Sequence, residues 1–142
     1  MDVNRIMSRN VASVPQKASL LEAAKLMDED RVGCVLVLDA DEKPVGILTD
    51  RDLVVRGVAK GNAVDETTVE SAMSAHPFTA CPDDSIMLVA RKMADKGIRR
   101  VPVVDEHGSV VGLVSVDDLL TVFIAELSNV AAAIVGSSRL IS

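Results

Sequence analysis

The chain has 142 residues, 49% of which are apolar, enough for one compact domain or for two small domains that pack together. Its formal net charge of -6 at pH 7 argues against a nucleic-acid partner, because non-specific affinity for nucleic acid comes mainly from lysines and arginines that neutralise phosphates. Phe78 and Phe123 are its only Phe, Tyr or Trp residues, so the stacking platforms of single-strand binders are missing as well.

The first half of the chain is predicted to contain three strands and two helices. A short opening segment, residues 3–7, is followed by a brief extended segment. A Ser-x-x-Glu capping box at Ser19 then leads into apolar residues at helical spacing. Residues 35–38 and 45–48 are short apolar runs typical of buried strands, and a second helix is expected to begin near Thr49. The predicted order is therefore strand, helix, strand, strand, helix.

The second half of the chain repeats the first. Residues 69–119 align with residues 3–53 without a gap, and the same order of elements is predicted in both copies. Because a repeat of this size rarely buries a core alone, we expect two repeats packed around a pseudo-twofold axis, with clefts at the seam. The positions identical in both copies, numbered in the first, are Val3, Met7, Ser8, Ser19, Ala24, Met27, Val35, Val37, Asp39, Val45, Gly46, Asp52 and Leu53.

The repeat defines the expected domain boundaries. Residues 1–60 form the first unit, the polar, glycine-containing residues 61–68 form a linker, and residues 69–127 form the second unit. The predicted fold class is α+β with α/β-type layers. Residues 128–142 form a tail whose apolar residues have helical spacing, so that this tail either covers a partner subunit or packs back on its own chain.

No secretory signal or membrane-spanning segment is expected. Residues 1–9 are interrupted by polar side chains. The longest clean apolar run of the C-terminal region, residues 130–135, is far shorter than the about 20 residues that span a bilayer. Cys34 and Cys81 lie in apolar surroundings without a CxxC spacing, which favours buried, reduced thiols over a metal or redox pair. We therefore expect a cytoplasmic protein without a metal site.

One motif occurs in both repeats, at residues 46–53 and 112–119: glycine, two apolar residues, Thr or Ser, two residues, Asp, Leu. The glycine would let the strand backbone approach a ligand. A carboxylate only accepts hydrogen bonds and suits a pair of ribose hydroxyls, while a hydroxyl at a helix N-terminus suits a phosphate. The same spacing is also an ordinary helix cap. The polar residues of the motif are Thr49, Asp52, Ser115 and Asp118.

These two segments resemble the nucleotide-binding signature of the cystathionine beta-synthase (CBS) domain family, and the duplication resembles the tandem pair called a Bateman module. The likeness extends from residue 3 to about residue 125, and residues 48–57 are similar to stand-alone members that carry no enzyme or transporter. It implies two tandem CBS repeats that bind AMP, ADP, ATP or S-adenosylmethionine in the clefts between them. Such a module is non-catalytic and signals to a regulated protein, here unknown, by conformational change.

The resemblance also implies roles for individual residues. Asp52 and Asp118 would hold ribose hydroxyls, and Thr49 and Ser115 would contact ribose or phosphate. Extended segments would offer backbone groups to the adenine edge, and the residue entering the second strand of each repeat would flank the ring. These residues are Ser13, Val14, Thr79 and Ala80 for the edge, and Val32 and Ile98 for the ring.

The two repeats differ in their basic residues. Arg99 and Arg100 lie in a pattern similar to that of phosphate-contacting family members, and a guanidinium matches phosphate geometry. They could equally be a solvated pair near a helix end. The first repeat has no such pair and would depend on Arg51 or on groups from the other repeat. We therefore expect the site that uses Asp118 to bind phosphorylated ligands more tightly than the site that uses Asp52.

Two other functions compete with that of a ligand sensor. Catalysis is disfavoured because no P-loop, Rossmann fingerprint, activated nucleophile or metal motif occurs, so no catalytic residue and no required cofactor are assigned. The alternative is a dimeric scaffold that binds no ligand. Modules of this family commonly form flat dimers through their helices, and the apolar segments 53–58 and 119–124 are compatible with a homodimer. No nucleic-acid or membrane partner is expected.

Overall fold

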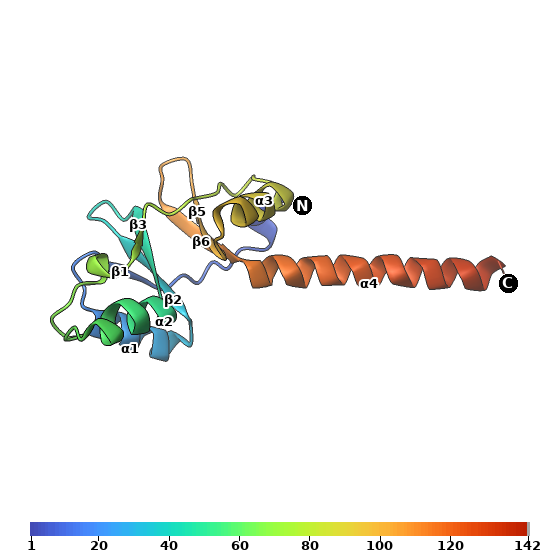
Figure 1. Cartoon of the computed structure of the whole chain (residues 1–142). Coiled ribbons are helices and arrows are strands. Elements are labelled where there is room, and N and C mark those ends of the chain that lie inside the picture. The colour runs from blue at the N-terminus through green and yellow to red at the C-terminus, as the bar shows by residue number, and fades with distance from the viewer. Residues whose placement is uncertain (142) are drawn as a thin grey trace.

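The computed structural model describes the backbone of residues 1–141 and the side chains of residues 1–137. Two units of similar order make up the body of the molecule, and one long helix extends from it (Figure 1). The first unit contains η1 (Val3–Arg5), β1 (Ser13–Pro15), α1 (Leu20–Asp30), β2 (Cys34–Leu38), β3 (Pro44–Thr49), α2 (Asp50–Asp52), η2 (Leu53–Gly57) and η3 (Val58–Lys60). The second contains η4 (Val69–Ser71), β4 (Ser74–Ala75), α3 (Ile86–Lys96), β5 (Arg100–Val104), β6 (Val110–Ser115) and α4 (Val116–Ile141).

The first long helix of each repeat begins at a serine, as predicted. The Ser19 hydroxyl accepts a hydrogen bond from the amide of Glu22 at 3.1 Å, and the Ser85 hydroxyl accepts one from the amide of Met87 at 3.1 Å. These bonds satisfy amides that the first turn of a helix leaves without a partner. Each helix buries three apolar residues at helical spacing, which fixes the face that packs on the core: Leu20, Ala23 and Met27 in α1, and Ile86, Val89 and Met93 in α3.

The two sheets follow one plan. In the first, β1 is parallel to β2, β2 is antiparallel to β3, and β3 is antiparallel to β4. In the second, β5 is antiparallel to β6, and Ala80 and Ser8 form isolated bridges to Val103 and Leu113 at the two outer edges. Ser74 of β4 pairs with Ile47 in the way that Ser8 pairs with Leu113. Each repeat therefore supplies the outermost segment of the other repeat's sheet.

The opening segment of each repeat also packs in the hydrophobic core of the other repeat. Val3 and Met7, from the start of the chain, are buried in a core with Val89 and Val101 of the second repeat. Val69, at the start of the second repeat, is buried in the core of the first. Figure 1 shows the N-terminus beside α3 rather than beside α1. The predicted boundary at residues 61–68 thus separates two sequence repeats, whereas the packing joins them through their opening segments.

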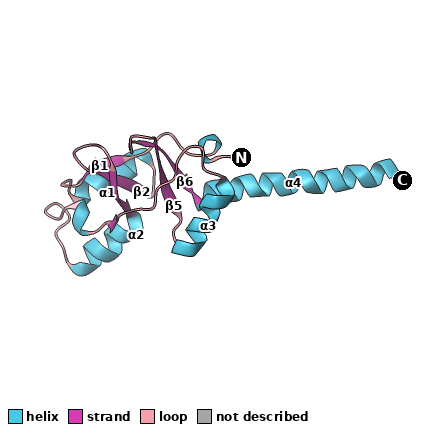
Figure 2. Cartoon of the chain, turned by 90° about the horizontal axis from the view of Figure 1, so that it is seen from above, coloured by secondary structure: helices cyan, strands magenta, loops and turns pink. Residues whose placement is uncertain are grey.

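The last helix, α4, is a continuous helix of 26 residues. Leu119 is 4% exposed and belongs to the core of the second repeat, whereas every described side chain from Ile124 to Ser137 is exposed. Figures 1 and 2 show this part of α4 projecting from the body. The expectation that the tail packs back on its own chain is therefore wrong for the described side chains, because all of them are exposed.

Within the stretch Val116–Ser137 of α4, a window of 18 residues has a mean hydropathy of 1.9, and 6% of that window is buried. By length and composition alone, it is long and apolar enough to cross a membrane. The expectations of a cytoplasmic location and of no membrane partner therefore stay predictions.

Candidate functional site

A cavity of about 410 Å³ lies between the two repeats, and both repeats line it. The end of β3 and the start of α2 form one wall, and the turn between α3 and β5 forms the other. An adjoining cavity of about 330 Å³ shares four of these residues and continues along the segment after β4. We call the two cavities together the inter-repeat cleft. The first is lined by Ile47, Thr49, Asp50, Arg51, Asp52, Ser74, Gly97, Ile98, Arg99 and Arg100.

Asp52 and Thr49 cap each other at the edge of the inter-repeat cleft. The Thr49 hydroxyl accepts from the Asp52 amide at 3.1 Å, and the Asp52 Oδ2 atom accepts from the Thr49 amide at 3.0 Å. The Asp52 Oδ1 atom lies 3.8 Å from the Nη2 atom of Arg56. The alternative interpretation of the motif as a helix cap is therefore confirmed. Because each carboxylate oxygen can accept two hydrogen bonds, Asp52 keeps acceptor capacity toward the cleft.

Ser115 and Asp118 form the same cap in the second repeat. The Asp118 Oδ2 atom accepts from the Ser115 amide at 2.8 Å, and the Ser115 hydroxyl accepts from the Asp118 amide at 3.1 Å. The matching geometry gives an internal control, because a substitution in either cap removes the same hydrogen bonds.

Arg99 and Arg100 lie in the cleft that contains Asp52. Their place in this cleft fits the expectation that the site of Asp52 uses groups from the other repeat, and which of the two sites binds phosphate more tightly stays a prediction. The turn before β5 faces the start of α2 across the seam, so the basic pair of one repeat meets the carboxylate of the other. Arg51 lines the same cleft, as predicted for the first repeat. The residues of the first repeat that correspond to the basic pair are Gly33 and Cys34, which carry no charge.

Gly33 makes room for two charged side chains at the seam. A Cβ atom at this position would lie 3.3 Å from the Asp50 Oδ2 atom and 3.6 Å from an Arg100 guanidinium nitrogen. The Asp50 amide also donates to the Gly33 carbonyl at 2.9 Å. Asp50, from the same repeat as Gly33, and Arg100, from the other repeat, therefore both lie close to the Gly33 backbone.

The neighbouring Cys34 is buried and Cys81 is exposed, so the expectation of two buried thiols is wrong for Cys81. Burial raises the pKa of the Cys34 thiol from its ordinary value of 9.0; the Arg100 guanidinium opposes this shift and the Asp50 carboxylate adds to it. At neutral pH Cys34 is therefore a protonated thiol rather than a nucleophilic thiolate.

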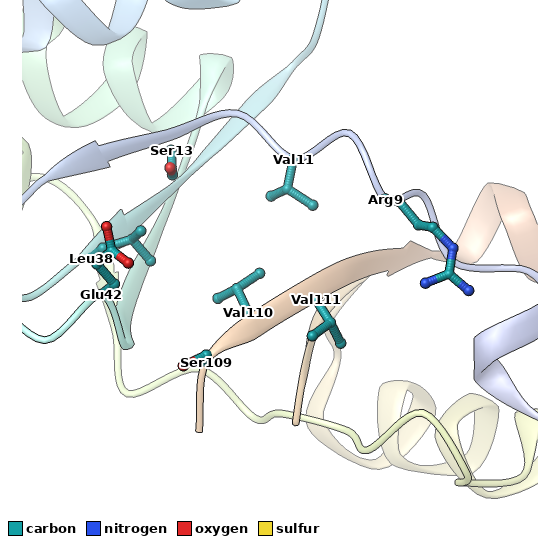
Figure 3. Close-up of a pocket in the computed structure, with 8 residues that line it drawn as sticks. All are labelled: Arg9, Val11, Ser13, Leu38, Glu42, Ser109, Val110 and Val111. Carbon is teal, nitrogen blue, oxygen red and sulfur yellow. The ribbon is translucent and has the colours of Figure 1, made fainter. Parts of the chain in front are cut away.

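The predicted adenine-contacting residues do not gather in one place. Ile98 lines the inter-repeat cleft. Thr79 lines another cavity of about 380 Å³. Ser13 lines a cavity of about 290 Å³ between the N-terminal segment and β6, where Figure 3 shows it with Arg9 and Glu42. Val32 follows α1, where its amide donates to the Met27 carbonyl at 3.0 Å.

The predictions for Val14 and Ala80 concern their backbone groups. The side chains of both residues are buried in the cores, where they are 8% and 1% exposed, and the prediction for the Val14 backbone stays a prediction. The Ala80 amide donates to the Pro102 carbonyl at 2.9 Å, and the Ala80 carbonyl accepts from the Val104 amide at 2.9 Å. Ala80 therefore has no unpaired backbone donor to offer an adenine, because its extended segment pairs with β5.

Sequence reasoning missed Ile47, Asp50 and Ser74, which line the cleft. Ile47 and Ser74 are partners in the pairing of β3 with β4, which joins the two repeats. The identity of Ser8 and Ser74 in the aligned repeats was the one available signal. Asp50 gave no signal, because it falls on a variable position of the motif.

The motif glycines have a different role from the one predicted. A Cβ atom at Gly112 would lie 2.6 Å from the Met7 sulfur, and one at Gly46 would overlap the side chain of Met73. Both methionines come from the opening segment of the other repeat. The close approach that glycine permits is therefore a packing contact between repeats, not an approach of the strand to a ligand.

Comparison with known proteins adds independent findings. The model of the CBS domain matches residues 3–57 and 69–125. An uncharacterized protein of Methanopyrus kandleri is 34% identical over 86% of this chain, and a homoserine O-acetyltransferase of Methanococcus vannielii is 30% identical over 82% of it. The matches span 62% of the first relative and 24% of the second, so this chain corresponds to only a part of each.

Two solved structures are similar over most of their length. A CBS domain pair in complex with 5'-methylthioadenosine and S-adenosylmethionine has a TM-score of 0.78 and 30% identity, covering 89% of this chain and 98% of that one. A CBS domain protein of Pyrobaculum aerophilum complexed with AMP has a TM-score of 0.79 and 28% identity, covering 91% of this chain and 99% of that one. Both carry adenosyl ligands.

Proposed function

Because the chain belongs to the CBS domain family, we propose that it is a non-catalytic regulatory module that binds an adenosine phosphate in its inter-repeat cleft. The observation that carries this proposal is the meeting of Asp52 with Arg99 and Arg100 in one cavity lined by both repeats. A ligand there contacts both repeats at once. Its binding can therefore shift their relative packing, to the extent that it prefers one arrangement over the other.

The residues of the cleft suit the parts of a nucleotide. Asp52 accepts hydrogen bonds from ribose hydroxyls, and Thr49 contacts the ribose or the phosphate. Arg99 and Arg100 bind the phosphate by charge-assisted hydrogen bonds. Ile98, which is half-buried, packs against the base. The two cavities, about 410 and 330 Å³, have the size typical of small-molecule sites.

The charge of the cleft favours a phosphate over a sulfonium. Three arginines and two aspartates line the larger cavity, which leaves an excess of positive charge. AMP carries negative charge that this excess attracts, whereas S-adenosylmethionine brings a sulfonium cation near the same guanidinium groups. We therefore expect AMP, ADP or ATP to bind more tightly than S-adenosylmethionine.

Titration calorimetry with AMP tests this proposal. Asp52→Ala should weaken the tighter AMP site at least about tenfold, because a hydrogen bond to a charged group contributes about 1.5–3 kcal/mol. Asp118→Ala is the matched control, since it removes the same cap in the second repeat without changing the cleft of Asp52. Equal weakening by both substitutions would contradict the assignment of the site.

The phosphate contact is tested separately with adenosine. The unmodified chain should bind AMP more tightly than adenosine, and the double substitution Arg99→Gln and Arg100→Gln should remove most of that difference while leaving adenosine binding unchanged. A ligand-free scaffold instead predicts that no adenine compound raises the melting temperature, because only a ligand that binds the folded state stabilises it.

The proposal also includes a homodimer. Val54 and Val58 are exposed on the helical segment after β3, and Leu120 and Ile124 are exposed at the corresponding positions of α4. Their exposed fractions lie between 53% and 57%, a high value for large apolar side chains that recur on equivalent helices. An apolar patch of this kind typically marks an interaction site. Sedimentation equilibrium of the chain measures the association.

A further inference from the structure

The cavity of about 290 Å³ in Figure 3 lies at the outer edge of β6. The N-terminal segment, the start of β6 and the turn after β2 line it, and none of its lining residues lines the inter-repeat cleft. Arg9 lies at one end and Glu42 at the other, with Val11, Val110 and Val111 between them. We call it the β6-edge cavity.

The two ends of the β6-edge cavity carry opposite charges that do not pair with each other. The Arg9 Nη2 atom donates to the Asn4 side chain at 2.8 Å and to the Asn4 carbonyl at 3.3 Å, which orients the guanidinium and uses one of its three nitrogens. The Glu42 carboxylate makes no hydrogen bond or ion pair with any residue that the structure describes. Each end can therefore pair with a charged group of a ligand.

Glu42 lies at a backbone position that favours glycine. Its φ of 61° is in the left-handed region, where a side chain costs conformational energy. No contact of the carboxylate with a described part of the chain offsets this cost. Residues held in such conformations are often found at ligand sites.

The charge pair is specific to this end of the molecule. The aligned second repeat has Ala75 in place of Arg9 and Gly108 in place of Glu42. The cavity of about 380 Å³ that Gly108 lines corresponds to the β6-edge cavity by this alignment, and no carboxylate lines it. The packing that both repeats share therefore does not require the pair.

The β6-edge cavity also contains a backbone acceptor. In the sheet of the first repeat, the Val45 carbonyl accepts from the His76 amide at 3.1 Å. The aligned residues are Val111 and Asn10, and among the described residues no such bond joins them. Because β3 and β6 have the same irregularity in their registers, the Val111 carbonyl points to the same outer edge as that of Val45. It can therefore accept a hydrogen bond from a ligand.

We propose that the β6-edge cavity binds a short, extended peptide with free termini. Arg9 pairs with the terminal carboxylate, Glu42 pairs with the terminal ammonium, and a peptide amide donates to the Val111 carbonyl. Small apolar side chains of the peptide pack against the valines. The volume of about 290 Å³ is at the lower limit of small-molecule sites, so the peptide has two or three residues, and three extended residues span about 10 Å.

Titration calorimetry with trialanine tests the site. N-acetylation or C-terminal amidation of the peptide should each weaken binding at least about tenfold, because each removes a charge-assisted hydrogen bond. Glu42→Gln should weaken the binding of trialanine by a similar factor and leave that of the N-acetylated peptide unchanged. Arg9→Gln should weaken the binding of trialanine and leave that of the C-terminal amide unchanged.

Asp41→Asn is the matched control for Glu42→Gln. It removes the same charge from the same turn at a residue that does not line the cavity, so it should leave trialanine binding unchanged. Circular dichroism shows whether each variant is folded. Glu42→Gln and Arg9→Gln should also leave AMP binding unchanged, because neither residue lines the inter-repeat cleft.

Four results would overturn the proposal. The first is the absence of trialanine binding at millimolar concentrations. The second is equal binding of trialanine and of the peptide with both termini blocked. The third is an equal effect of Glu42→Gln and Asp41→Asn. The fourth is competition between AMP and trialanine, since this would place the peptide in the inter-repeat cleft.

Discussion

Asp52 combines a structural and a proposed binding role in one side chain. Its carboxylate closes a capping box with Thr49 and at the same time lines the inter-repeat cleft. The cap holds the carboxylate in one orientation before any ligand arrives, which lowers the entropic cost of binding. The two interpretations of the motif, cap and ligand contact, are therefore compatible.

Gly112 shows how strongly one missing side chain controls the contact between repeats. A Cβ atom there would lie 2.6 Å from the Met7 sulfur and 3.0 Å from the Ser8 carbonyl oxygen. We expect Gly112→Ala to lower the free energy of unfolding by about 1–3 kcal/mol, because the core around Met7 must move. Urea denaturation measures the loss.

Gly136→Ala is the control for this substitution. Apart from the adjacent residues and the backbone of its own helix, no described atom lies within 4 Å of a Cβ atom built at Gly136, which lies inside α4, so alanine should be neutral or stabilising there. If Gly112→Ala and Gly136→Ala had the same stability, Gly112 would not be needed for packing Met7.

At the scale of elements, the capping boxes determine where the second helices begin. α2 begins directly after Thr49 and α4 directly after Ser115, as the motif predicts. These signals are local, because a cap involves residues only three positions apart. Helix starts and the strand before them were therefore predictable without knowledge of the fold.

Thr49→Ala tests the cap of α2. The substitution removes the hydroxyl that accepts from the Asp52 amide at 3.1 Å, and we expect a loss of about 1 kcal/mol in the free energy of unfolding. Thr49→Ser, which keeps the hydroxyl, should restore most of it. Thermal or urea unfolding of the three proteins gives the comparison, and equal stability of the alanine and serine variants would show that the cap contributes nothing.

Other elements were not predictable from local patterns. β4 is only two residues long and forms because Ser74 meets Ile47 of the other repeat. The extended segment around Thr79 and Ala80 resembles β1 in sequence position, yet it makes a single bridge to β5. Whether such a short segment pairs as a strand depends on which sheet edge lies beside it in the fold. Its own sequence therefore gives little indication that it will form a strand.

At the scale of the whole molecule, the exchange of opening segments joins the stability of the two repeats. Val3 and Val69 are both 0% exposed, each in the core of the other repeat. A substitution at the start of one repeat should therefore lower the stability of the other repeat. This coupling gives a route by which a ligand between the repeats can alter the whole module.

Hydrogen exchange of Val3→Ala and Val69→Ala tests this coupling. Each substitution should cost roughly 2 kcal/mol, from the lost burial and the cavity that remains. Val3→Ala should increase amide exchange mainly in α3 and β5, and Val69→Ala mainly in α1 and β2. Faster exchange confined to the repeat that contains the substitution would contradict the exchanged cores.

The amino-acid sequence by itself determined the duplication, the order of strands and helices, the caps, and the residue types that suit a nucleotide. These features depend on residues a few positions apart or on a comparison of one half with the other. The sequence therefore sufficed to predict the family and to name Asp52, Arg99 and Arg100 as candidates.

Only the tertiary structure decided which of these residues share a cleft. Arg99 and Arg100 of the second repeat line one cavity with Asp52 of the first, and Met7 and Met73 each pack against a glycine of the opposite repeat at the same seam. It also decided that the end of α4 leaves the body. Such contacts join residues far apart in the chain, and their free energy comes from packing that no local pattern encodes.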